Sequence, residues 1–382
     1  MPDERISSIR ISPDNATVLS NLGLLREFAG TWEGDGFNLI ARPDFEGDAD
    51  LYLQLNQTRE HLKVDPIGSS IPNRGFGQND IELFGLTYLQ KISDAATGGA
   101  LHIEPGIWIT QPNTTYPPEA APAGDQLIAR MGTIPHGNSM LAQGIAAPFE
   151  GDPVLASGAV PYAFSQFPSF NSTPFGIPPS PALPILNAPG STSKLTAPPG
   201  FPEYDLLVPA SAANPRTPFG TTEPPLPATI EGVPMQDVIN DPIKILQAIV
   251  SRQKADGFSF SGTVLNIATQ AKINFFKNPN STKPTDPSTT VNVTNGAGGI
   301  ENILFLEGGD PVGNKGANAD TALVYATFWI ERVTHPEHRP FMQLQYAQMV
   351  ILEFEILKLL PQTAVNLGWP HISIATLRKA FN

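Results

Sequence analysis

Proline is the residue that most restricts how this chain of 382 residues can fold. Of its 40 prolines, 20 lie between Pro148 and Pro234. Proline has no backbone N–H to donate to a β-ladder, so this segment cannot form the interior of a sheet. Apolar residues are nevertheless spread through it, namely Phe164, Phe167, Phe170, Phe175, Leu183 and Ile185. Because disordered linkers usually lack such residues, we expect an ordered, irregular insertion that packs on the main domain, with a solvated linker as the alternative.

The sequence on both sides of the insertion alternates between apolar and polar residues. Leu51–Gln57 has leucine at every second position, and Phe341–Phe354 alternates with Gln348 as the exception on its apolar face. Period two of this kind is typical of β-strands that have one wet or ligand-facing side. Further strand candidates are Thr31–Ile40, Ile81–Ile92, Leu101–Thr110, Gln126–Gly132, Met140–Ala147, Phe258–Ile273, Thr321–Val333 and His371–Lys379.

About ten antiparallel strands predict a mainly β fold, a calycin-like β-barrel, because closure removes the exposed edges of so many strands. One short helix is expected over Ser20–Phe28. A second is expected after Asp241, with Pro242 in its first turn and Gly257 at its end. The chain is therefore predicted to be a single domain.

The predicted domain has three parts along the chain. Residues 22–148 and 257–381 form the barrel, and the proline-rich insertion interrupts it at about 149–235. We find no internal repeat that would suggest two similar domains.

Charge and the lack of cysteine exclude several classes of protein. The net charge of −13 disfavours nucleic acid and anionic membrane surfaces as partners, because both need clustered basic residues. Without cysteine, thiolate ligation of haem, C-x-x-C-H attachment and cysteine zinc sites are excluded. The polar segment Met1–Asn15 does not resemble a secretory signal, and no apolar run approaches the ~20 residues of a membrane helix. We expect a cytoplasmic protein whose partner is a small molecule. Whether it forms a homo-oligomer stays open.

Four motifs follow one another in the two barrel segments. They are Gly30–Gly36 (GTWEGDG), Leu101–Trp108 (LHIEPGIW), Met131–Gly137 (MGTIPHG) and Leu367–Lys379 (LGWPHISIATLRK). A short helix that leads into a Gly-x-Trp strand is how calycin-type barrels begin. There the glycine allows a sharp bend, and Trp32 is predicted to plug one end of the barrel.

The four motifs, in this order, resemble the nitrobindin family of haem-binding β-barrels. That family opens with Gly-x-Trp-x-Gly-x-Gly, carries Leu-His-x-Glu-x-Gly-aromatic in mid-domain and ends in a histidine-bearing strand that finishes Thr-Leu-Arg-Arg/Lys. This chain departs from the pattern where Ile107 stands between Gly106 and the aromatic Trp108. The resemblance covers Leu22–Pro148 and about Gly257–Phe381, and it leaves out the proline-rich insertion.

The resemblance implies haem b as the cofactor and His371 as the residue that binds its iron. The local pattern agrees, because Ser373 and Ala375 share a strand face with His371 and leave room for a flat macrocycle. A neutral imidazole is also a usual haem ligand. A structural histidine at a strand start after Pro370 is the alternative.

Three further residues are assigned to the expected site. Trp32 and Met349 are predicted to be further contacts of the cofactor. His136 matches a position near the pocket rim where the family usually has no histidine, and it is a candidate distal catalytic group over the iron. A turn histidine between Pro135 and Gly137 is the alternative.

Two other groups of polar residues need an interpretation. His102 and Glu104 share a strand face, and the family match suggests a structural hydrogen-bonded pair, with a general acid/base pair as the alternative. His335–His338 looks like a small metal cluster, but its proline breaks a strand, so we predict a hairpin turn there.

The leading functional prediction is a haem b-binding barrel that binds small ligands, or acts on peroxide, peroxynitrite or an organic substrate, at the iron. Whether it is an enzyme stays open. An insertion that roofs the haem would favour an organic substrate, with peroxidase-like or isomerase activity. The alternatives are a non-haem carrier of a lipid or other apolar molecule, and an interaction module that uses the proline-rich segment.

Overall fold

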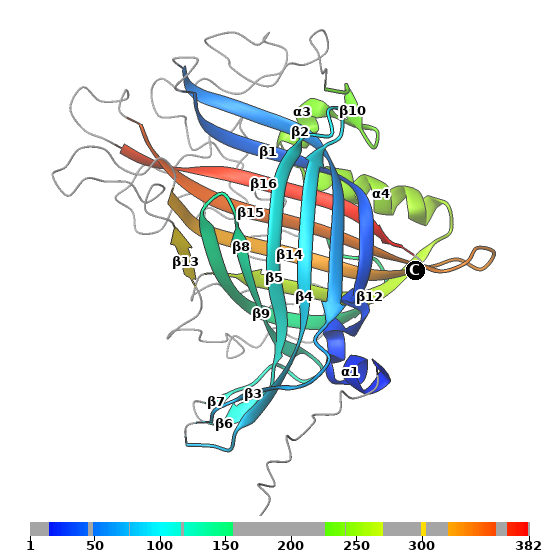
Figure 1. The fold of residues 1–382 in the computed structure, drawn as a ribbon. Coiled ribbons are helices and arrows are strands. Elements are labelled where there is room, and N and C mark those ends of the chain that lie inside the picture. Colours follow the sequence, from blue (N-terminus) through cyan, green and yellow to red (C-terminus); the bar gives the residue numbers. More distant parts are fainter. Residues whose placement is uncertain are drawn as a thin grey trace, which may run out of the picture.

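A computed structural model describes residues 15–44, 49–75, 77–115, 118–155, 226–240, 242–269, 299–302, 320–356 and 365–380. Ten long strands dominate it (Figure 1). They are β1 (Gly30–Asp44), β2 (Ala49–Pro66), β4 (Ile81–Asp94), β5 (Ala100–Gln111), β8 (Gln126–Ile134), β9 (Asn138–Glu150), β12 (Ser259–Ala268), β14 (Asp320–Thr334), β15 (Phe341–Ile356) and β16 (Val365–Lys379).

These strands form a closed antiparallel barrel, which confirms the predicted fold class. Their order around the barrel is β12-β14-β15-β16-β1-β2-β4-β5-β8-β9, and β9 pairs with β12 to close the ring. Every barrel strand overlaps a segment in which period two predicted a strand. Closure leaves each long strand with a neighbour on both sides over at least part of its length.

The shorter elements decorate this barrel. Helices are α1 (Asn15–Asn21), the 3₁₀ helix η1 (Gly23–Phe28), α3 (Met235–Asn240) and α4 (Ile243–Ala255). Short strands are β3 (Ile71–Asn73), β6 (Thr114–Thr115), β7 (Pro118–Glu119), β10 (Thr229–Ile230), β11 (Val233–Pro234) and β13 (Gly299–Asn302). Strand β13 pairs with the first residues of β9, beyond the point where β12 ends.

The two predicted helices are present with different bounds. In place of one helix over Ser20–Phe28, the chain forms α1 and η1, which are separated near Gly23, where φ is +57°. Helix α4 begins after Pro242 and is followed by Gly257 at a φ of +91°, a left-handed conformation that suits glycine. The expected N-cap, Asp241, lies outside the described residues.

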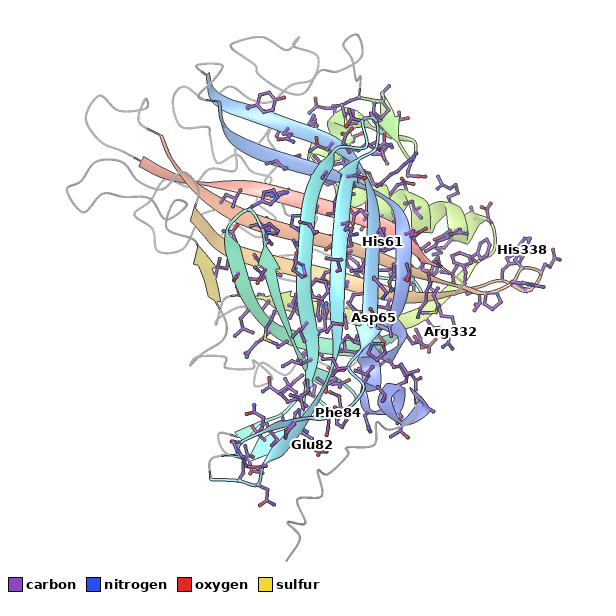
Figure 2. All side chains as sticks on the ribbon, viewed as in Figure 1. His61, Asp65, Glu82, Phe84, Arg332 and His338 are labelled. Atoms are coloured by element: carbon purple, nitrogen blue, oxygen red, sulfur yellow. The ribbon has the colours of Figure 1, made fainter. Side chains whose placement is uncertain are left out.

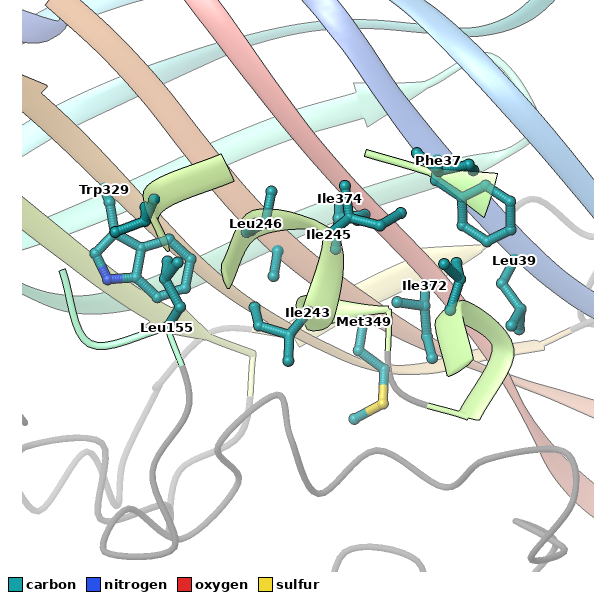
Figure 3. Close-up of a cluster of buried hydrophobic side chains, with 14 of the residues drawn as sticks. Phe37, Leu39, Leu155, Ile243, Ile245, Leu246, Trp329, Met349, Ile372 and Ile374 are labelled. Carbon is teal, nitrogen blue, oxygen red and sulfur yellow. The ribbon is translucent and has the colours of Figure 1, made fainter. Parts of the chain in front are cut away.

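Helix α4 packs along the outside of the barrel, where a second apolar core forms (Figure 3). Ile245 and Leu246 of the helix pack with Ile372 and Ile374, which point outward from β16. Burying one large apolar side chain contributes roughly 1.5–3 kcal/mol, so this layer stabilises the fold substantially. Helix α4 thus covers the outer face of these strands, whereas the alternation predicted strands with one wet or ligand-facing side.

Both ends of the proline-rich insertion dock against this outer layer. Leu155 precedes its central part, and Leu226, Ile230 and Met235 follow it, and all four are buried in the cluster under α4. The central part, 156–225, lies outside the described residues, so the predicted roof over the barrel stays a prediction.

One polar group is buried between α4 and the barrel. Glu331 of β14 is fully buried, and its Oε2 accepts a 2.7 Å hydrogen bond from Nε2 of Gln343, which also contacts Gln253 of α4. Its other oxygen, Oε1, has no hydrogen-bond partner in the part of the chain that the structure describes. Burial, only partly offset by the hydrogen bond from Gln343, raises the pKa of Glu331 to about 8.

Candidate functional site

One end of the barrel, which we call the plugged end, is filled by Phe28, Trp32, Trp108 and Phe328. Trp32 is completely buried, and its Nε1 donates a 2.8 Å hydrogen bond to the backbone oxygen of Phe28. The Phe28 and Phe328 rings each lie under 6 Å from Trp108, in edge-on geometry. This arrangement agrees with the plug that the Gly-x-Trp motif predicted.

Trp32 lies far from His371 along the strands. In the pairing of β1 with β16, Trp32 lies opposite Lys379, whereas Ile40 lies opposite His371. The eight residues that separate Trp32 from Ile40 extend roughly 26 Å along β1. Trp32 therefore belongs to the plug and does not share a site with His371, which corrects its assignment as a cofactor contact.

His371 lies at the other end, which we call the histidine end because His102 and His136 are also there. Burial, together with the charges of the nearby His102 and His136, lowers the pKa of His371 to about 3. The imidazole is therefore neutral at physiological pH. Within the described part of the chain, its ring makes no hydrogen bond.

Small and polar residues line the barrel next to His371. Ser373 and Ala375 follow it on the inner face of β16, and Ser373 Oγ donates a 2.7 Å hydrogen bond to Oδ1 of Asn38. Asn56 lies opposite Asn38 in the pairing of β1 with β2, and its buried Nδ2 has no hydrogen-bond partner among the described residues. A buried amide N–H without a partner is a group that a ligand could satisfy.

An apolar cluster occupies another side of the histidine end. Val350 lies opposite His371 in the pairing of β15 with β16, and it packs with Met140 and Val324. His371 is therefore placed between an apolar wall and a row of small polar residues.

Met349 lies on the other side of the sheet from His371. Its partner in β16 is Ile372, and both residues pack in the outer cluster under α4 (Figure 3). Because neighbouring strand residues point to opposite faces, Met349 cannot face the same chamber as His371. This placement corrects its assignment as a cofactor contact.

His136 occupies the turn between β8 and β9, between Pro135 and a left-handed Gly137 with φ +116°. Its ring centroid lies 5.9 Å from that of His102. Burial and the neighbouring His102 lower its pKa. His136 is therefore a turn residue, as the alternative reading predicted, and it also lies beside His102.

A buried polar layer, which the sequence did not reveal, crosses the barrel between its two ends. Its centre is Arg130 of β8, whose guanidinium donates to Oε1 of Glu104 at 2.7 Å, to the Tyr88 hydroxyl at 3.0 Å and to Oε1 of Gln348 at 2.8 Å. The Tyr88 hydroxyl also donates to Glu104. Gln348, the exception to the apolar pattern of β15, thus has a partner inside the barrel.

Glu104 connects this layer to the histidine end. Its Oε2 lies 3.3 Å from Nε2 of His102, which agrees with the predicted pair. Burial alone would raise the pKa of Glu104, but the charge of Arg130 and the hydrogen bonds from His102 and Tyr88 hold it at about 2. The carboxylate is therefore ionised at any physiological pH.

The motif glycines make room for this layer. A Cβ at Gly106 would collide with the Tyr88 ring, and a Cβ at Gly132 would collide with Glu104 and Tyr88. The glycines in LHIEPGIW and MGTIPHG are thus explained by the close approach of buried side chains to the backbone.

A second buried carboxylate, Glu60 of β2, lies close by. It accepts hydrogen bonds from the Tyr346 hydroxyl at 2.7 Å, from Nε2 of Gln90 at 3.1 Å and from the Thr58 hydroxyl at 3.2 Å. Burial outweighs these hydrogen bonds and raises its pKa to about 7. Glu60 therefore changes its charge near neutral pH, which Glu104 does not.

A cavity of about 760 Å³ is lined by Glu60 and by His102, the partner of Glu104. It is lined by Glu33, Gly34, Asp35, Arg59, Glu60, His61, Lys91, Ile92, Ser93, Gly98, Ala100, Leu101, His102, Ile103 and His136. This volume lies within the range of small-molecule sites. His102 and His136 thus line a cavity together, and His371 is not among its lining residues.

The His335–His338 segment forms a turn, as predicted. It joins β14 to β15, where His338 is labelled in Figure 2. The His335 and His338 rings lie 4.4 Å apart, next to Phe258. Within the described ranges, no group of three or more histidine, cysteine, aspartate or glutamate residues is placed to hold a metal ion. No helix in those ranges is long and apolar enough to cross a membrane.

Comparisons with known proteins add little. No family model matches the chain, and no curated protein matches it. A crystal structure of Rv2717c from M. tuberculosis aligns with a TM-score of 0.32 and 10% sequence identity over 96% of this chain and 100% of that chain. Such a low score carries no inference about fold or function.

Proposed function

We propose that the barrel binds haem b at the histidine end, with His371 as the ligand of the iron. The observation that carries this proposal is the state of His371. Its side chain is partly buried and its ring is neutral, and no described side chain forms a hydrogen bond with it. A neutral nitrogen with a free lone pair is what haem iron requires of a histidine.

The surroundings of His371 fit a flat, mostly apolar ligand. Ser373 and Ala375 are small, buried side chains on the same strand face, and Val350 belongs to an apolar wall beside it. Bound haem would supply an iron atom at which small ligands or peroxide bind. His102 and His136, which act electrostatically on His371, would offer ring nitrogens to what binds there. The resemblance of the four motifs to nitrobindins supports the same proposal.

The second candidate is a carrier of an apolar small molecule without iron. The cavity of about 760 Å³ favours it, because its walls include Ile92, Leu101 and Ile103, and His371 is not among its lining residues. A carrier would bind its ligand without any help from His371.

Haem titration of the purified protein separates the two candidates. We expect a sharp Soret band that saturates at one haem per chain, and His371→Ala should weaken binding at least tenfold. His61→Ala is the matched control, because the side chain of His61 is 44% exposed and lies beside Glu33. Equal haem affinity in wild type and His371→Ala would reject iron ligation by His371 and favour the carrier.

A further inference from the structure

His102 is held by a carboxylate whose two oxygens have separate partners. Oε1 of Glu104 accepts hydrogen bonds from Arg130 and Tyr88, whereas Oε2 lies 3.3 Å from Nε2 of His102. Glu104 is fully buried, and the side chain of His102 is 16% exposed. The pair therefore reaches from the buried polar layer to the wall of the cavity.

The ionised carboxylate fixes the tautomer of His102. A carboxylate without a proton can only accept hydrogen bonds, so Nε2 of His102 carries the proton and donates it. The other ring nitrogen, Nδ1, then keeps its lone pair. No hydrogen bond to Nδ1 is present among the described residues, and His102 lines the cavity. Nδ1 is thus the nitrogen left for a ligand.

A histidine that donates one N–H to a buried carboxylate, and offers its other nitrogen to a cavity, has the arrangement of a general base. We propose that His102, positioned by Glu104, accepts a proton from the hydroxyl of a neutral phenol or enol bound in this cavity. In this step the ligand O–H bond breaks and an N–H bond forms at Nδ1. An oxyanion and an imidazolium result, and the charge of Glu104 stabilises the imidazolium.

The walls of the cavity indicate this class of ligand. Ile92 of β4, which lies opposite His102, and Ala100 of β5 offer apolar contacts to a ring, whereas the charged lining residues are of both signs. Glu33 and Asp35 are matched by Arg59 and Lys91, and Glu60 adds a negative charge above a pKa of about 7, so an anionic ligand gains no net attraction. A neutral molecule with an apolar body and one acidic hydroxyl satisfies both features.

The other charged groups around His102 set the pH range of proton transfer. Arg130 of β8 and a protonated His136 of the β8–β9 turn oppose an imidazolium at His102, and His371 of β16 is held neutral. Glu60 of β2 interacts with His102 and becomes negative above a pKa of about 7. Proton transfer to His102 should therefore become more favourable as the pH rises through about 7.

The proposed proton transfer takes place in the cavity and does not involve His371, so its test is independent of haem binding. The test uses the full purified chain without added haem, and 4-nitrophenol as the probe, because the phenol and its anion differ in colour. Bound nitrophenol should ionise at a pH about one unit below that of the free compound, a tenfold shift in its ionisation equilibrium. The readout is its absorption as a function of pH at saturating protein.

Two glutamine variants decide the role of His102. His102→Gln keeps a donor for Glu104, so the fold should persist; it should still bind nitrophenol but lose the shift. His61→Gln is the control, since His61 lines the same cavity but lies 3.8 Å from an exposed Glu33. An unshifted pKa in wild type, an equal shift in His102→Gln, or no binding of nitrophenol would each overturn the inference. None of these outcomes would change the Soret band expected from His371.

Discussion

The plugged end and the histidine end are built from the same ten strands, yet one is solid and the other offers space. At the plugged end, the inner positions carry Phe28, Trp32 and Trp108, whose rings fill the barrel. At the histidine end, the inner positions of β16 carry His371 and Ser373, whose side chains are smaller. The difference shows that side-chain volume on the inner face decides where a closed barrel can hold a ligand.

The largest expected effect is at the plugged end. Trp32→Ala should cost about 3–5 kcal/mol, because it leaves a cavity in a fully packed cluster. His371→Ala, at the histidine end, should cost less than about 1 kcal/mol in the protein without ligand. Urea denaturation of both variants tests the comparison, and equal losses would show that the two ends are packed alike.

Next in size is the polar layer between the two ends. Arg130→Met should destabilise the protein by about 3 kcal/mol or more, because it leaves Glu104 buried without its cation. The double variant Arg130→Met/Glu104→Gln should recover part of that loss. If the single variant is as stable as wild type, the ion pair between Arg130 and Glu104 does not stabilise the barrel.

A smaller effect is expected outside the barrel, at Glu331 under α4. The pKa of Glu331 is about 8 in the folded protein and 4.5 in the unfolded chain. The folded protein is therefore most stable below pH 4.5, where Glu331 is protonated in both states, and it loses stability as the pH rises towards 8. Glu331→Gln should therefore stabilise the protein at pH 8, by roughly 1–3 kcal/mol, and much less at pH 5. Thermal melting at both pH values checks this. A gain that does not depend on pH would contradict the titration.

The sequence predicted the barrel well, because period two is a local property of each strand. It also predicted the plug and the contact of His102 with Glu104, since residues two apart in one strand share a face. Arg130 was missed because a lone arginine in an apolar strand gives no sign of its partners. The exception of Gln348 to its pattern was the available signal for the polar layer.

Other features depend on long-range packing that a single sequence does not show. The apolar residues on both faces of β16 make sense only once α4 covers the outer face. Met349 was assigned to the ligand although it is out of phase with Val350 on the same strand. Strict alternation along β15 would have placed Met349 on the outer face of the barrel.

The most direct test of haem ligation by His371 is chemical rescue. His371→Gly removes the side chain and leaves space for free imidazole in the position of the ring. With haem alone, this variant should show a weak, shifted Soret band, and added imidazole should restore the wild-type band with a saturable dose dependence. A wild-type spectrum and haem affinity in His371→Gly before imidazole is added would contradict the central claim that His371 binds the iron.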